Sequence, residues 1–182
     1  DIKKKTIEVR KSISSINELV FVDYLDKNKG LDDSSWSFII ENNKTEEIIF
    51  ERVPFNSPLY ILYSSGTTGK PKCIVHSVGG VLLQHIKEHT YHCDFRKNDR
   101  IMYFTTCGWM MWNWMVSALA KEVTLVIYDG SPVEPDMNIL FKIADIEKLT
   151  FLGVSAKYID SLAKADVNPK KYFSLSNLRI IA

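Results

Sequence analysis

The hydrophobic positions after residue 99 alternate between short apolar runs and longer stretches with helical spacing. The short runs have the length of buried strands and lie at 101–105, 124–128, 150–154 and 178–181. The longer stretches have the length of helices and lie at 109–120, 137–147 and 155–165. Strands and helices that alternate at this short spacing predict an α/β fold, with a doubly wound, largely parallel sheet and flanking helices.

The chain before residue 54 has a different organisation. Residues 1–16 carry apolar positions at helical spacing, and the apolar run at 19–22 is expected to be a short buried strand. A polar loop then leads to Ser35, a candidate N-cap for a short helix. We expect 1–53 to be a lead-in segment (helix, strand, loop) that belongs to the same large domain as the rest.

Near residue 54 the chain changes from a polar stretch to a sequence with apolar runs, and this change marks its second part. Two strands are expected at 59–63, read as buried, and at 73–76, and a helix is expected from about 81 to 91. Together with the alternating pattern that follows, they define an α/β subdomain at 54–182. The final apolar run has nothing after it, so we expect this subdomain to be truncated at its C-terminal end.

Composition and charge narrow the classes of partner. The 182 residues are 46% hydrophobic and 25% charged, as in folded globular proteins, and the net charge of +1 favours neither nucleic acid nor a membrane surface. The most apolar stretch, 109–120, is too short to cross a bilayer. Cys73, Cys93 and Cys107 are odd in number and lack CxxC spacing, which favours reduced thiols. These features predict a soluble, cytoplasmic protein.

The run from Tyr63 to Lys72, YSSGTTGKPK, concentrates phosphate-binding chemistry directly after an apolar strand. Glycines let backbone N–H groups approach phosphate oxygens, hydroxyls add donors, and lysine adds a compact positive charge. The spacing differs from a Walker A loop, which needs four residues between its glycines and a Ser or Thr after the lysine. A phosphate-loop NTPase is therefore disfavoured.

The complete string resembles the signature loop of the adenylate-forming superfamily, which includes acyl-CoA synthetases, adenylation domains and luciferases. The resemblance implies that this loop wraps the β- and γ-phosphates of ATP, which makes 54–182 a nucleotide-binding subdomain. Lys72 would be the lysine of the motif, and Lys70 would occupy its variable position. The phosphate-binding residues implied are Ser64, Ser65, Gly66, Thr67, Thr68, Gly69 and Lys72.

Downstream segments resemble the short-chain synthetases, and in particular the acetoacetyl-CoA synthetase family, from about 54 to 133. The segments that carry this resemblance are 73–80, 84–89, 108–116 and 128–132. It implies an acid–thiol ligase that uses ATP, Mg²⁺ and coenzyme A to convert acetoacetate through an acyl-adenylate to its thioester. An acetyl-type synthetase and a non-catalytic remnant stay open as alternatives. The chain departs from its relatives at 121–123, Lys-Glu-Val, where they usually carry a glycine.

The same resemblance implies that Trp109 and Met111 border the acyl pocket, where large side chains favour a small acid. Three other residues of this apolar stretch are expected in the core, namely Trp114, Val116 and Leu119. Segments that the family uses for adenine, for the ribose and for its adenylation lysine are not found, so we expect weak nucleotide binding by this chain and identify no certain catalytic residue.

Histidines recur at helical spacing in the expected helix at 81–91 and just after it. His85, His89 and His92 fall on one face, which is favoured to be solvated or partly packed because no HExxH glutamate accompanies them. His76 is expected to pack beside the site. We therefore expect no metal site on the chain.

Overall fold

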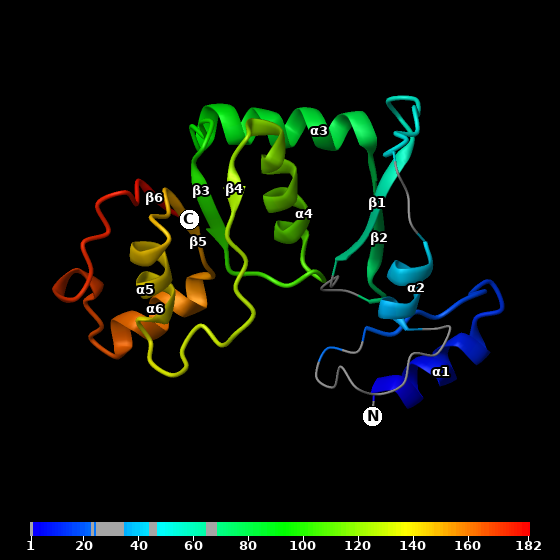
Figure 1. The fold of residues 1–182 in the computed structure, drawn as a ribbon, viewed down its shortest axis with the longest axis horizontal. Helices are drawn as coiled ribbons and strands as arrows, with labels where there is room; N and C mark the ends of the chain where they lie inside the picture. The colour runs from blue at the N-terminus through cyan, green and yellow to red at the C-terminus, as the bar shows by residue number, and fades with distance from the viewer. Residues whose placement is uncertain (1, 23, 25–34, 44–46, 65–68) are drawn as a thin grey trace. The chain divides into compact units, whose positions relative to one another are not determined.

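The computed structural model describes residues 2–22, 24, 35–43, 47–64 and 69–182. The chain divides into two compact units, Asp1–Arg52 and Val53–Ala182. Each unit has its own arrangement and is described by itself. Figure 1 shows the ribbon of the whole chain.

The first unit contains two helices, α1 (Ile2–Ser12) and α2 (Trp36–Asn42). Ser35 caps α2 as predicted, because its hydroxyl accepts a hydrogen bond from the Phe38 N–H at 3.2 Å. The expected buried strand at 19–22 is wrong. Phe21 makes only an isolated bridge to Ser35, and Val20 and Val22 are exposed. In the described part of this unit the run has no partner strand, so it forms no ladder of hydrogen bonds.

The second unit contains a four-stranded parallel sheet in the order β4-β3-β5-β6, which confirms the predicted α/β fold. Its strands are β3 (Arg100–Tyr103), β4 (Thr124–Leu125), β5 (Phe151–Gly153) and β6 (Ile180–Ile181). The two central strands pair in register, with Ile101 opposite Phe151 and Met102 opposite Leu152. Each of the four strands is shorter than predicted; β3 begins one residue before its predicted range, and the other three lie within theirs.

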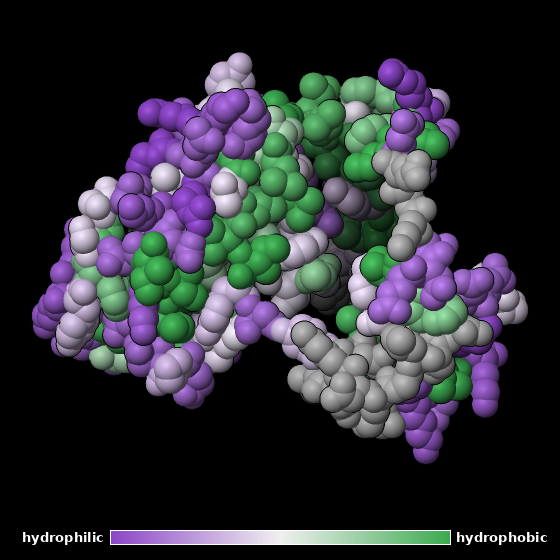
Figure 2. Space-filling view, in the orientation of Figure 1, coloured by the Kyte–Doolittle hydropathy of each residue, from purple (hydrophilic) through white to green (hydrophobic). Residues whose placement is uncertain are grey.

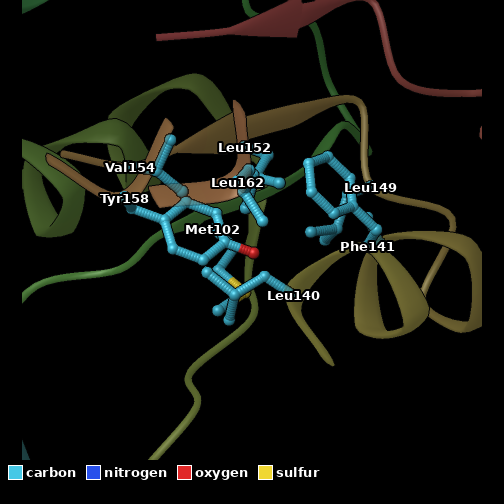
Figure 3. Packing of buried hydrophobic residues seen from close by; sticks show 9 residues of the cluster. Met102, Leu140, Phe141, Leu149, Leu152, Val154, Tyr158 and Leu162 are labelled. Carbon is cyan, nitrogen blue, oxygen red and sulfur yellow. The ribbon is translucent and has the colours of Figure 1, made fainter. Parts of the chain in front are cut away.

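Helices cover both faces of this sheet. Ile101 and Phe151 point towards α4 (Met110–Ser117), while Met102 and Leu152 point the other way. On that second face they pack against α5 (Ile139–Ile146) and α6 (Ala156–Lys164). Figure 3 shows the side chains of this second cluster converging from the strands and the two helices. The strand pleat therefore divides the core into two layers.

The expected strand at 59–63 exists but is not buried. β1 (Pro58–Ser64) pairs antiparallel with β2 (Lys72–Ser77) in a two-stranded sheet of its own. Ile61 and Tyr63 on its outer face are 57% and 72% exposed. The hairpin lies beside the start of α3 (Val78–Lys87), which Ser77 caps by accepting a hydrogen bond from the Gly80 N–H at 3.2 Å.

Three short helical turns complete the second unit. The π-helix η1 (Glu88–His92) extends α3, and the 3-10 helices η2 (Ala118–Lys121) and η3 (Pro169–Lys171) follow α4 and α6. η2 ends at Glu122, whose φ of 56° is left-handed. This turn lies at 121–123, where the family resemblance predicts a glycine. Glu122 adopts the backbone conformation that glycine adopts without strain.

Candidate functional site

The phosphate loop predicted from the sequence connects the two strands of the hairpin. Ser64 ends β1, Lys72 begins β2, and the two residues pair across the hairpin. Gly69 has a φ of +151°, and among the described residues, its chain neighbours apart, no atom lies within 4 Å of the position that a Cβ would take. Glycine is therefore required here by the backbone conformation and not by lack of space. The rest of the predicted set lies outside the described residues, namely Ser65, Gly66, Thr67 and Thr68.

The loop runs from strand to strand, whereas a Walker A loop joins a strand to a helix. The structure thus agrees with the sequence argument against a phosphate-loop NTPase. Lys72 is exposed, as is Lys70 two residues earlier. Both ammonium groups are therefore accessible to a ligand from solvent.

Parallel sheets bind ligands outside the carboxyl ends of their strands, where neighbouring connections leave towards opposite faces. The chain has such a switch point between β3 and β5. From β3 the chain passes to α4 on one face, and from β5 it passes to α6 on the other. A cavity of about 400 Å³ lies there, lined by residues that follow β3 and by Ser155, which follows β5.

Trp109 and Met111 both line this cavity, which we call the switch-point cavity. Trp109 is 70% exposed and precedes the first turn of α4. None of the described residues that line the cavity carries a charge; they are aromatic, sulfur-containing or hydroxyl-bearing. The surface suits a small uncharged group with hydrogen-bonding capacity.

A second cavity, of about 500 Å³, lies between the hairpin, α3 and α4, and we call it the hairpin cavity. Figure 2 shows it as a hollow bordered by hydrophobic side chains. His76 lines it, as does the half-buried Glu88. The Glu88 carboxylate accepts hydrogen bonds from Trp114 Nε1 at 2.8 Å and from Gln84 Nε2 at 2.6 Å. One carboxylate charge and several acceptors make this cavity unfavourable for an anion.

The histidine face is more deeply packed than predicted. His85 is 8% exposed and His89 is fully buried, while only His92 is exposed. His85 Nδ1 and His89 Nε2 both lie 2.9 Å from Ser117 Oγ on α4. Among the described residues no group of His, Cys, Asp and Glu side chains could hold a metal ion. On the histidine face, α4 covers His85 and His89, and its Ser117 is the hydrogen-bond partner of both rings.

Burial sets the protonation of these rings. It lowers the pKa of His89 to about 4, with a smaller contribution from the neighbouring His85. The pKa of His85 is also lowered, chiefly by burial. Both imidazoles are thus neutral near pH 7. They act as hydrogen-bonding groups and not as cations.

The apolar stretch at 109–120 carries only part of the predicted core. Trp114 is buried at 6% exposure, but Val116 and Leu119 are 38% and 54% exposed. Sequence reasoning did not single out Glu88 or Ser117, although Ser117 interrupts this stretch. In the part of the chain that the structure describes, no helix has both the length and the apolar character to cross a membrane.

Comparison with known proteins gives a consistent picture. The acetoacetyl-coenzyme A synthetase of Rhizobium meliloti is 58% identical over 134 residues, which cover 74% of this chain and 21% of that protein. The acetoacetyl-CoA synthetase of Gallus gallus is 41% identical over 98% of this chain and 28% of its own length. The chain therefore spans about a quarter of these relatives.

A solved structure and a family model extend the likeness. The acetoacetyl-CoA synthetase from Streptomyces lividans superposes on the whole chain with a TM-score of 0.87 at 36% identity, and the match covers 28% of that chain. The family model described as AMP-binding enzyme matches residues 3–182. Because this match includes nearly every residue, the chain belongs to the family of AMP-binding enzymes.

Proposed function

We propose that this chain is the phosphate-loop-bearing part of an acetoacetyl-CoA synthetase, an AMP-forming acid–thiol ligase. The observation that carries the proposal is its similarity to curated acetoacetyl-CoA synthetases, which reaches 58% identity and extends over up to 98% of the chain. The full-length enzyme would act on small molecules in the cytoplasm. The near-zero net charge supports the absence of a nucleic-acid partner.

In the proposed reaction, a carboxylate oxygen of acetoacetate attacks the α-phosphorus of ATP, and pyrophosphate leaves. The coenzyme A thiol then attacks the acyl carbon of the adenylate, so that a thioester forms and AMP departs. The part of this chain is to position the phosphates and offset their charge, through the loop from Ser64 to Gly69 and the ammonium group of Lys72. Mg²⁺ would accompany ATP, and it would supply part of the charge that offsets the phosphates.

The loop assignment is tested with Lys72→Ala in the full-length product of the gene. We expect acetoacetate-dependent ATP–pyrophosphate exchange to fall by about 10²-fold, because a donor that stabilises the charge on the departing pyrophosphate is lost. Lys70→Ala is the matched control, since Lys70 is equally exposed but occupies the variable position. Equal exchange by the Lys72 variant and the wild type would remove Lys72 from the site.

We assign the acid to the switch-point cavity, bordered by Trp109 and Met111. Met111→Ala should lengthen the pocket and raise kcat/KM for hexanoate relative to acetoacetate by about tenfold, which corresponds to burying one or two more methylene groups. Met110→Ala is the control, because Met110 lines the hairpin cavity instead. An unchanged preference in the Met111 variant, or the same change in both, contradicts the assignment.

Another short-chain acid is the runner-up substrate. Exchange assays with acetate, butyrate and acetoacetate, at matched concentrations, decide between them. A full-length protein that gives no exchange with any acid would instead be a non-catalytic relative.

A further inference from the structure

Helix α4 has the switch-point cavity at its start and a set of polar contacts on its flank. Trp109 and Met111 line the cavity, whereas Trp114 and Ser117, further along, contact α3 and η1. Trp114 lies three residues after Met111, which is slightly less than one helical turn. Because α4 is a continuous helix, contacts that hold Trp114 and Ser117 in place also set the positions of Trp109 and Met111 at the cavity.

The hydrogen positions in this set follow from its geometry. The Ser117 hydroxyl donates to the Trp114 carbonyl at 2.7 Å, so its oxygen is left to accept. His85 Nδ1–H and His89 Nε2–H then donate to that oxygen, each at 2.9 Å. One serine thus uses its donor and both lone pairs, and each imidazole has a defined tautomer.

These contacts favour one rotation of α4 about its axis. Turning the helix by one residue, about 100°, would remove Ser117 from both imidazoles and Trp114 from Glu88. Each buried donor that is left without an acceptor loses its hydrogen bond to water with nothing to replace it, which is unfavourable. Apolar packing alone is more tolerant, because similar side chains can exchange places. A satisfied polar network is therefore a stronger determinant of rotation than the surrounding core.

The helix that packs against α4 is irregular next to this hydrogen-bond network. α3 continues into the π-helix η1, in which the Cys93 N–H donates to the Glu88 carbonyl at 3.0 Å. Short π-helical turns are rare and frequent at functional sites. This one begins at Glu88 and contains His89, so the irregular turn coincides with the residues that bind α4.

We propose that Glu88 and Ser117 are positioning residues for the acid pocket: they set the rotation of α4 and, through it, the places of Met111 and Trp109. The inference rests on the proposed function, because it takes the switch-point cavity as the acid site. Neither residue lines that cavity, so neither would touch the acid. A displacement of one ångström at reacting groups can cost up to about 10²-fold in rate.

The test uses the full-length protein with Glu88→Ala and Ser117→Ala. We expect KM for acetoacetate to rise about tenfold and KM for ATP to change by less than about twofold. Glu88→Gln keeps an acceptor for the indole N–H, so both KM values should stay at the wild-type level. Gln84→Ala is the matched control, because it removes only the exposed donor to Glu88 and leaves the Trp114 bond.

Hydrogen exchange across 104–117, followed by mass spectrometry, supplies a readout that does not require activity. Exchange in this segment should increase in the two alanine variants and stay at the wild-type level in Glu88→Gln and Gln84→Ala. If Glu88→Ala does not fold, Glu88→Asp is used instead, because its side chain is one methylene shorter and moves the carboxylate away from the indole.

Parallel losses for acetoacetate and ATP, or unchanged exchange in this segment, would overturn the positioning role. The absence of acid-dependent activity in the wild type would instead contradict the proposed function, and the exchange data would still decide whether the network fixes α4.

Discussion

Acidification should destabilise this fold through His89. The ring is fully buried, 5.4 Å from the ring of Phe95 and 4.5 Å from that of Trp114 between centroids. Its Nε2–H already donates to Ser117, and its buried Nδ1 has no hydrogen-bond partner among the described residues. A second proton would place a charge and an unsatisfied N–H in this pocket.

The magnitude follows from the two pKa values of His89. Burial lowers the pKa to about 4 in the folded state, whereas an unfolded histidine has a pKa of about 6.5. His85 and Lys121 lower the pKa further, and Glu88 and a contact with Trp114 oppose the shift. Below pH 6.5 the unfolded chain binds a proton that the folded chain does not, so the free energy of unfolding falls. The loss is about 2 kcal/mol at pH 5 and about 3 kcal/mol at pH 4, and it falls from about 0.4 kcal/mol at pH 6.5 towards zero as the pH rises further.

Two measurements on the full-length protein check this. Exchange of the imidazole C2–H, followed by mass spectrometry, gives the titration midpoint of His89 itself, with the urea-unfolded protein as reference. Urea unfolding at pH 7 and pH 5 gives the stability change, and His89→Phe should reduce that change by about 2 kcal/mol because phenylalanine does not titrate. A midpoint near that of the unfolded chain, or equal pH dependence in both proteins, would refute the reasoning.

Three further changes test other parts of the second unit by thermal unfolding. Asp99→Ala removes the nearly buried carboxylate that lies 2.5 Å from Arg179 Nη2, and we expect a loss of about 2 kcal/mol because the guanidinium loses the nearer of its two carboxylate partners and the Arg96 N–H loses its acceptor. Glu122→Gly should raise the free energy of unfolding by about 0.5–1 kcal/mol, the relief of left-handed strain less the entropy that glycine adds to the unfolded chain. Gly153→Ala would place a Cβ 2.1 Å from the Tyr103 ring, so we expect a loss of about 1–3 kcal/mol and weaker acetoacetate binding as the ring turns into the cavity. An unchanged melting temperature contradicts the first and third, and a decrease contradicts the second.

The parallel sheet was predictable because its two central strands have buried side chains on both faces. β3 and β5 read as continuous apolar runs, and helices of matching length follow them. The hairpin was harder, since the run at 59–63 has the same composition. Periodicity in so short a run does not separate a sheet interior from a strand with one exposed face. The prediction of a buried strand at 19–22 was wrong for a related reason: whether a run finds a partner strand depends on the tertiary structure and cannot be inferred from the run itself.

The candidate site likewise contains residues that a local sequence pattern identifies and residues that only the fold brings together. The phosphate loop is a local string, so its residues can be found without a structure, whereas Trp109 and Met111 were identified through family resemblance. The network around Ser117 escaped because its members are distant in sequence: His89 and Ser117 lie 28 positions apart. A serine within an apolar helix is the only local sign of it, and such a residue is equally compatible with solvent exposure.

The position of one carboxylate supports our proposal that the smaller cavity is the acid site. The hairpin cavity is larger, at about 500 Å³ against about 400 Å³, and by size alone it would be preferred. It holds the charge of Glu88, which the indole of Trp114 and the amide of Gln84 fix in place. A substrate carboxylate 5 Å from that charge would be repelled by about 3 kcal/mol at an effective dielectric constant of 20, a penalty of more than about 10²-fold in affinity. The same glutamate that holds α4 in one rotation thus also disfavours the acid on the wrong side of the helix. If this reasoning holds, Glu88→Gln should leave acetoacetate binding at the switch-point cavity intact while removing the electrostatic barrier to weak anion binding at the hairpin cavity.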